Sequence, residues 1–255
     1  MWMAITRGVS AALARCALEY QPRIPIDIAT AAAQHRDYEL VLERCGLPVT
    51  SLPAHPEFPD GLFVEDPAIV LDEIAVICRM GAASRRGEGE SLAEALRPFR
   101  KLESIREPAT IEGGDVMRLG KTLFCGISRR TNREGARQLA SMVEPFGYTV
   151  IPVEVSGCLH LKSAICPVAD DTVLLNRRSI GVEAFGGLKM LDIAGEEAGA
   201  ANVLRIGGKI IMPASFPRTR EMLERAGFEV MTVDISELQK AEAGVTCSSL
   251  IFKVA

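Results

Sequence analysis

The feature of this sequence that most restricts its fold is a pair of short strand-like segments that returns at nearly regular intervals. The pairs turn at acidic or glycine residues, and the turn at Gly207-Gly208 is typical of a two-residue β-hairpin. The pairs begin near residues 68, 115, 163 and 202, and a further first strand begins near 247. Intervals of about 39 to 48 residues are typical of solenoids and propellers.

A helical segment and then another strand follow each complete hairpin. The clearest helix is expected over 132–147, where Ala136, Leu139 and Val143 share one face and Gly147 ends the helix. Thr131 or Asn132 is its expected cap. The other expected helices are 91–99, which Ser91 and Glu94 would begin as a capping box, 179–187 and 216–228.

The fifth unit is divided between the two ends of the chain. Residues 247–255 supply its first strand, and the N-terminal part supplies a second strand (3–7), a helix (25–46) and a last strand (48–52). Pairing the ends closes the ring and leaves no open sheet edge. The alternative, a doubly wound α/β sheet, places single strands between its helices. The sequence therefore predicts one domain, residues 1–255, built as a closed ring of five strand–strand–helix–strand units.

Composition and charge exclude several classes of function. Lysine and arginine number 29 against 33 acidic residues, a net charge of −4, and no basic block occurs, so nucleic acid and membrane surfaces are not expected partners. The sequence has neither an apolar run of membrane-spanning length nor a secretory signal. Its seven cysteines are odd in number and form no CxxC, which favours a reducing compartment. We expect a cytoplasmic protein.

The residues with reactive side chains lie where the hairpins start. In a propeller these starts converge on the central channel, and they carry Glu65-Asp66, Glu112, His160 and Cys247. A lone histidine or a strand cysteine is more often structural. The shared position in different units changes that interpretation, because a cysteine, a histidine and carboxylates in one pocket are the groups that nucleophilic catalysis needs.

Three further patterns bear on which residues could form a functional site. Strand alternation over 157–163 places His160 on one face and its leucine neighbours on the other. The arginine pairs in SRRGE (84–88) and SRRTN (128–132) are solvated turns, or each provides one guanidinium for a substrate carboxylate. His35 and His55 have no neighbours at metal-ligand spacing, and no nucleotide-binding motif occurs, so neither a metal nor a cofactor is predicted.

In their order and spacing these motifs are similar to those of one enzyme family. FVED, IEGGD, SRR, GISRRTN, CLHLKS and VTCSSLIF resemble the dimethylargininases of the pentein, or amidinotransferase, superfamily, from about residue 6 to 252. The resemblance implies a five-bladed α/β propeller. It also implies Cys247 as the nucleophile, His160 as the general acid and base, and Glu112 as the acid that completes the triad. The substrate contacts that it implies are Asp60, Glu65, Asp66, Arg85, Arg130, Leu13 and the backbone of Ala241, while Lys162 is expected to be structural.

The activity that the resemblance implies is hydrolysis of methylated arginines to citrulline, with a small guanidino amino acid as the ligand. The segment ARCALEYQPRIP (14–25) lies where the family carries a mobile loop over the substrate, and it matches no loop of known specificity. A hydrolase of citrulline, arginine or another guanidino or ureido compound is therefore an alternative. A non-catalytic propeller that binds cationic amino acids or a partner protein is another. The outer helices could pair in a homodimer.

Overall fold

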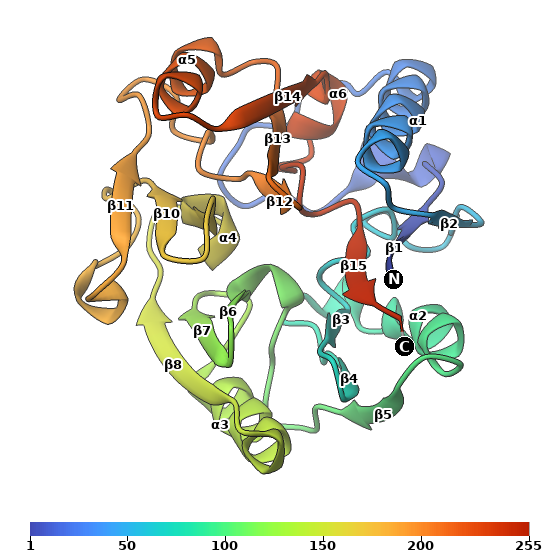
Figure 1. The fold of residues 1–255 in the computed structure, drawn as a ribbon. Helices are drawn as coiled ribbons and strands as arrows, with labels where there is room; N and C mark the ends of the chain where they lie inside the picture. The colour runs from blue at the N-terminus through green and yellow to red at the C-terminus, as the bar shows by residue number, and fades with distance from the viewer. Residues whose placement is uncertain (255) are drawn as a thin grey trace.

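The computed structural model describes residues 1–254, which form five three-stranded sheets arranged in a ring (Figure 1). The sheets contain, in order, β15 (Leu250–Lys253), β1 (Trp2–Arg7) and β2 (Val49–Leu52); β3 (Ala68–Val70), β4 (Ile74–Ile77) and β5 (Lys101–Ser104); β6 (Val116–Leu119), β7 (Thr122–Ile127) and β8 (Thr149–Glu154); β9 (Ile165–Pro167), β10 (Thr172–Leu175) and β11 (Lys189–Asp192); β12 (Leu204–Ile206), β13 (Lys209–Pro213) and β14 (Glu229–Val233). In every sheet the first two strands are antiparallel and the last two parallel. The predicted fivefold repeat is confirmed.

The predicted closure by the two chain ends is also confirmed. β15 runs antiparallel to β1, with Trp2 opposite Lys253. The amino group of Met1 donates to the carbonyl oxygen of Val254 (3.1 Å), and the Val254 amide donates back to the carbonyl of Met1 (2.7 Å). The fifth unit is therefore complete only when both ends of the sequence are present.

Four helices lie on the outside of the ring (Figure 1). They are α1 (Ile28–Arg44), α2 (Gly89–Leu96), α3 (Arg133–Val143) and α5 (Pro217–Arg225). The fourth unit has a short 3₁₀ helix, η5 (Glu183–Phe185), instead. Short helical turns complete the connections: η1 (Ala11–Arg15), η2 (Ala83–Arg85), η3 (Gly113–Asp115), η4 (Glu144–Phe146), α4 (Leu161–Ala164) and α6 (Ser236–Gln239).

The predicted limits of the helices were right for α3 and wrong for α2. The Asn132 side chain accepts the Gly135 amide (2.8 Å) at the start of α3, and Gly147 takes the left-handed conformation, φ +77°, after the last helical turn. The capping box expected at Ser91 and Glu94 is absent, because α2 already begins at Gly89 and the Ser91 hydroxyl accepts a bond from the Arg7 guanidinium (2.7 Å).

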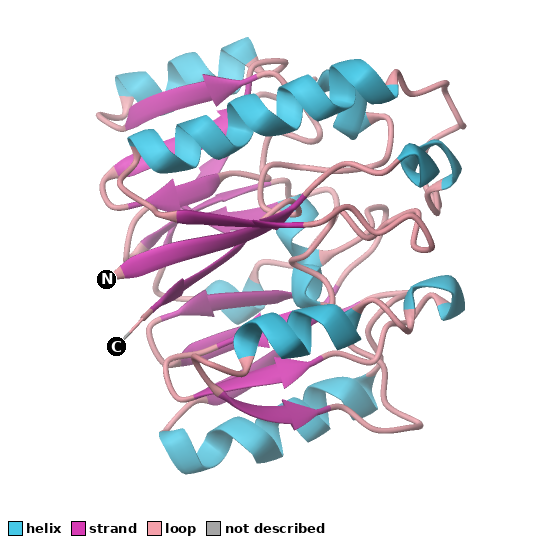
Figure 2. Cartoon of the chain, turned by 90° about the vertical axis from the view of Figure 1, so that its right-hand side faces the viewer, coloured by secondary structure: helices cyan, strands magenta, loops and turns pink. Residues whose placement is uncertain are grey.

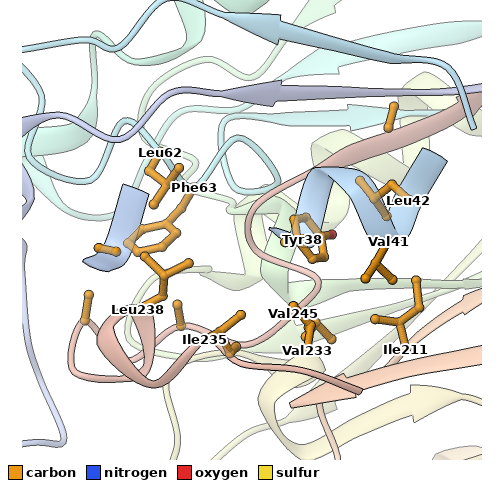
Figure 3. Packing of buried hydrophobic residues seen from close by; sticks show 14 of the residues in the cluster. Tyr38, Val41, Leu42, Leu62, Phe63, Ile211, Val233, Ile235, Leu238 and Val245 are labelled. Atoms are coloured by element: carbon orange, nitrogen blue, oxygen red, sulfur yellow. The ribbon is translucent and has the colours of Figure 1, made fainter. Parts of the chain in front are cut away.

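The core lies between the sheets and the outer helices, and its largest cluster surrounds α1 (Figure 3). Tyr38 and Leu42 of α1 pack in one cluster with Val233 of β14 and Val245. The Tyr38 hydroxyl is hydrogen-bonded to the hydroxyl of Ser249 (2.7 Å) in the buried interior. Helix α1 thus supports the segment that leads from α6 to β15, where Cys247 lies.

The strand expected over 157–163 is not formed. His160 caps the short helix α4, and the Leu161 amide donates to the Asp115 carboxylate (2.8 Å). The interpretation of this segment as an alternating strand was wrong, because its conformation depends on a carboxylate far away in the sequence.

The ring has two different faces, which are visible edge-on in Figure 2: the described chain ends lie at one face, and long irregular loops gather at the other. Because the first strand of each sheet runs against the second, the residues before the first strand reach the face opposite the hairpin turns. This topology brings to one face the four hairpin starts that carry Glu65-Asp66, Glu112, His160 and Cys247. Within residues 1–254, no helix combines the length and the apolar character needed to cross a membrane.

Candidate active site

Glu112 and two glycines form the floor of the candidate site. The Glu112 side chain is fully buried, and its carboxylate accepts the Gly81 amide (3.0 Å). A Cβ on Gly113 would lie 2.0 Å from the carbonyl oxygen of Glu65, and one on Gly114 would lie 2.6 Å from Nδ1 of His160. Only glycine at these two positions allows the segments that precede the first strands of neighbouring units to approach so closely.

His160 is hydrogen-bonded to Glu112, as the triad prediction requires. Its Nε2 lies 2.8 Å from Oε2 of Glu112, and its Nδ1 lies 3.8 Å from Oδ1 of Asp66. Burial disfavours the charged ring, but the negative charges of Asp66, Asp115 and Glu112 and the bond to Glu112 outweigh burial and raise the pKa of His160 to about 9. The imidazole is therefore protonated at neutral pH and can donate a proton.

Glu112 stays ionised for the complementary reason. Burial acts to raise the pKa of its carboxyl, but the bond to His160 and the positive charges of His160, Arg85 and Arg130 hold this pKa well below its usual range. The Arg130 guanidinium approaches Oε2 to 3.4 Å. The result is a buried imidazolium–carboxylate pair, which fixes the orientation of the ring.

Arg85 lies among acidic side chains of the protein itself. Its guanidinium donates to Asp66 (2.8 Å) and to both oxygens of Glu88, and its side chain is almost completely buried. Burial raises the pKa of Glu88 to about 7, against the effect of Arg85. Through its bond to Asp66, Arg85 orients this carboxylate toward His160.

Cys247 lies on the other side of the Glu65-Asp66 pair. Its carbonyl oxygen accepts the Glu65 amide (3.2 Å), and its Sγ accepts the Gly244 amide (3.4 Å). Burial first, and then the charges of Glu65 and Asp66, raise the pKa of the thiol well above its usual range. At neutral pH the sulfur is therefore a neutral thiol in this arrangement.

Glu65 and Lys162 join three hairpin starts behind the cysteine. The Lys162 ammonium donates to Glu65 (2.5 Å), and the Thr246 hydroxyl donates to the second Glu65 oxygen (2.7 Å). These three residues line the inner end of a cavity of about 1210 Å³ that extends among the hairpin turns. Lys162 is structural in this arrangement, and no local pattern around it identified Glu65 as its partner.

Of the remaining predicted contacts, Asp60 and Arg130 bind residues 17–19. These residues belong to the segment that the family resemblance places over the substrate, and residues 16–21 are called the covering segment below. The Ala17 amide donates to both oxygens of Asp60 (3.1 and 3.2 Å). Nε of Arg130 donates to Glu19 (2.5 Å), a residue that the motif comparison did not identify. Leu13 and Ala241 are both buried in the core cluster around α1, so their side chains lie apart from the charged groups.

The grouping of Asp66, Glu112 and His160 was also considered as a metal centre. One potential ligand atom from each lies within 4.8 Å of the others. However, the closest nitrogen and oxygen are already at hydrogen-bond distance, and the carboxylates of Asp66 and Glu112 already pair with the guanidinium groups of Arg85 and Arg130. The groups present suit a hydrogen-bonded proton-transfer cluster better than a metal site.

Comparisons with known proteins agree with this geometry. Residues 19–250 match the family described as N,N dimethylarginine dimethylhydrolase, eukaryotic. An N(G),N(G)-dimethylarginine dimethylaminohydrolase of Pseudomonas aeruginosa is 40% identical over 89% of this chain and 90% of its own length. The enzyme of the same name from Streptomyces coelicolor is 37% identical over 90% of this chain and 93% of its own. A structure of a cysteine-to-serine mutant of the Pseudomonas enzyme complexed with citrulline has a TM-score of 0.93 at 37% identity, covering 99% of this chain and 100% of that one.

The ring of five ββαβ units, with a histidine–carboxylate pair and a cysteine at one face, defines an α/β propeller hydrolase of the pentein superfamily. Within that superfamily, the chain belongs to the dimethylarginine dimethylaminohydrolase family.

Proposed function

We propose that this protein hydrolyses Nω-methylated arginines to citrulline and dimethylamine or methylamine, and that residues 1–255 act as one catalytic domain. The observation that carries this proposal is the buried His160–Glu112 pair, whose Nε2–Oε2 distance is 2.8 Å, in a chain that belongs to this family. The nearby acidic groups suit a cationic substrate.

In the proposed first step, Sγ of Cys247 attacks the guanidinium carbon, and a tetrahedral adduct forms. His160 donates its proton to the departing amine, the carbon–nitrogen bond breaks, and an S-alkylthiouronium group remains on the cysteine. His160, now neutral, takes a proton from water, and the hydroxide adds to the same carbon. The carbon–sulfur bond then breaks, the added hydroxyl gives up its proton as the carbonyl of citrulline forms, and Cys247 regains a proton in place of the one lost to the solvent when substrate bound.

The substrate itself supplies the charge that activates the cysteine. Burial, together with the charges of Glu65 and Asp66, holds the pKa of the Cys247 thiol high. A guanidinium bound beside these carboxylates offsets their charge and favours the thiolate. Proton loss from Cys247 is thus coupled to substrate binding, and the reaction so drawn uses only the chain, the substrate and water.

The other residues are assigned to binding. Asp60, Glu65 and Asp66 surround the guanidinium end in this proposal. Arg130 is assigned to the amino-acid carboxylate. Arg85, also expected from the family resemblance to contact that carboxylate, is instead bonded to Asp66 and Glu88 and supports the site by holding Asp66. Leu13 and the backbone of Ala241 border the covering segment.

The deciding experiment is a substrate screen. Incubation with asymmetric dimethylarginine is expected to give citrulline and dimethylamine, measured by chromatography and mass spectrometry. Cys247→Ser is the matched control, because it changes one atom and should lose activity by more than about 10³-fold. Release of ammonia from arginine or citrulline, without turnover of methylarginines, would instead support the alternative hydrolase. Ligand binding without any turnover would support the non-catalytic propeller.

Two further assignments belong to this proposal. The first is a cytoplasmic location, where reducing conditions would keep the seven free cysteines as thiols. A homodimer through the outer helices stays a prediction that sedimentation analysis would test.

A further inference from the structure

Glu242 makes contacts that the proposed reaction does not use. It lies between Ala241 and the Gly244–Cys247 turn, and its carboxylate accepts three consecutive backbone amides of the covering segment: Glu19 (3.1 Å), Tyr20 (2.6 Å) and Gln21 (2.7 Å). Consecutive amides that point at one anion form a nest, and bonds to a charged acceptor are stronger than neutral ones.

The backbone of Glu242 supports a special role for this side chain. Its φ is +60°, and it is the one non-glycine residue with positive φ among residues 1–254. An ordinary side chain in this left-handed conformation is strained. A glycine would relieve that strain but would lose the carboxylate that binds the three amides.

The segment held in this way reaches the candidate active site at two points. The Glu19 carboxylate accepts a bond from Arg130, whose other nitrogen contacts Glu112 (3.4 Å). The Ala17 amide binds Asp60. The three amides bound by Glu242 are therefore those of Glu19, whose side chain reaches the charged cluster, and of the two residues that follow it.

We propose that Glu242 is a positioning residue whose carboxylate holds residues 16–21 closed over the candidate active site and keeps Glu19 against Arg130. The inference rests on the proposed function in one respect only, namely that substrate binds beneath this segment. Glu242 touches no reacting atom and acts through the backbone that it orders.

The first test is hydrogen–deuterium exchange of the free protein at residues 19–21. In Glu242→Gln the charge is lost while the size is kept, and exchange there is expected to become at least about tenfold faster. Glu237→Gln is the matched control, because the Glu237 carboxylate also accepts a backbone amide, that of Asp27 (2.8 Å), but Asp27 lies outside residues 16–21. Unchanged protection in Glu242→Gln, or equal loss in Glu237→Gln, would overturn the proposal.

A second variant separates the carboxylate from backbone strain. Glu242→Gly accepts positive φ freely, so it should fold without backbone strain at this position and still show fast exchange at residues 19–21. If residues 19–21 of this folded variant exchanged as slowly as in the wild type, the carboxylate of Glu242 would not be what holds the segment.

Steady-state kinetics provide the functional measurement. With methylarginine, Glu242→Gln should raise KM by about tenfold and change kcat by less than about threefold, since closure holds substrate without entering the chemical step. An equal fall in kcat with unchanged KM would contradict a positioning role. If the wild type turned over no methylarginine, the proposed function would fail while the exchange result would still decide the role of Glu242.

Discussion

The His160–Glu112 cluster and the covering segment 16–21 are held in opposite ways. In the cluster, side chains bind other side chains in the interior, and Asp66, Glu112 and His160 are at most 3% exposed. In the segment, backbone amides bind carboxylates that come from other parts of the chain, while the Tyr20 side chain is 43% exposed. The first arrangement fixes the orientation of the imidazole ring, and the second meets the cluster through one side chain, that of Glu19, which binds Arg130.

This difference separates chemistry from access. Each member of the cluster is constrained by more than one partner, so its protonation state is set before a ligand arrives. The covering segment depends on a few carboxylate–amide bonds at its edge, and such bonds are the kind that local opening breaks first. Variants in the two regions should therefore differ in both the kind and the size of their effects.

The largest effect is expected when the charged pair itself is broken. Glu112→Gln keeps the shape of the side chain but removes the negative charge that favours protonated His160. We expect kcat to fall by about 10²- to 10³-fold and the pKa of His160 to fall below its wild-type value of about 9. The pH–rate profile and NMR titration of the imidazole measure the two changes, and an unshifted imidazole would contradict the assignment.

The same pair predicts how stability depends on pH. The pKa of His160 is higher in the folded state, at about 9, than the value of about 6.5 expected in the unfolded chain. Protonated His160 therefore adds its full share to the free energy of unfolding below about pH 6.5, and this share is lost as the pH rises through about 9. Urea unfolding of the wild type should therefore show a decline over this range. The decline should be smaller in Glu112→Gln, and equal slopes in the two proteins would count against the ion pair.

An intermediate effect is expected from the glycine that lies against the cluster. In Gly114→Ala the new methyl group would meet Nδ1 of His160 at 2.6 Å and the Asp66 carboxylate at 2.7 Å. We expect a loss of about 1 to 3 kcal/mol in the free energy of unfolding, together with lower activity. Gly208→Ala is the control, because a Cβ there meets no atom within 4 Å. Similar stability of the two variants would show that the cluster tolerates displacement.

The smallest effect is expected in the covering segment. The Tyr20 side chain is exposed and the residue is held through its amide, so Tyr20→Ala should change the free energy of unfolding by less than about 0.5 kcal/mol. Tyr38→Phe removes a hydroxyl whose partner, Ser249, is buried, and should cost about 1 kcal/mol. Thermal or urea unfolding compares the two, and a larger loss for Tyr20→Ala would reverse the distinction between the regions.

The sequence predicted the repeating parts of this molecule because their signals are local. Turn residues such as Gly207-Gly208 and the cap at Asn132 act within a few positions of themselves. Their recurrence was enough to predict five units, the closure of the ring and the common face of the hairpin starts. The proximity of Glu112 and His160 followed from that topology.

The parts that sequence reasoning missed depend on distant partners. The prediction of a strand where helix α4 forms was wrong because the Asp115 carboxylate that binds the first amide of this helix lies 46 residues away. Ser91 was taken for a helix cap because nothing nearby indicated that its hydroxyl binds Arg7. Glu19 and Glu242 lie in loops without a motif, and only the folded structure brings them together. Positive φ at Glu242 has no signature in the residue type.

The meeting of β1 and β15 has a consequence for how the ring is encoded. Met1 and Val254 exchange two backbone hydrogen bonds, so a linker of a few residues could join the ends, and the chain could be opened instead at the turn of another unit. Such a circular permutant would keep the neighbours of every sheet while changing which unit is interrupted. The order of units around the ring, rather than the point at which the chain interrupts one of them, is what this architecture requires.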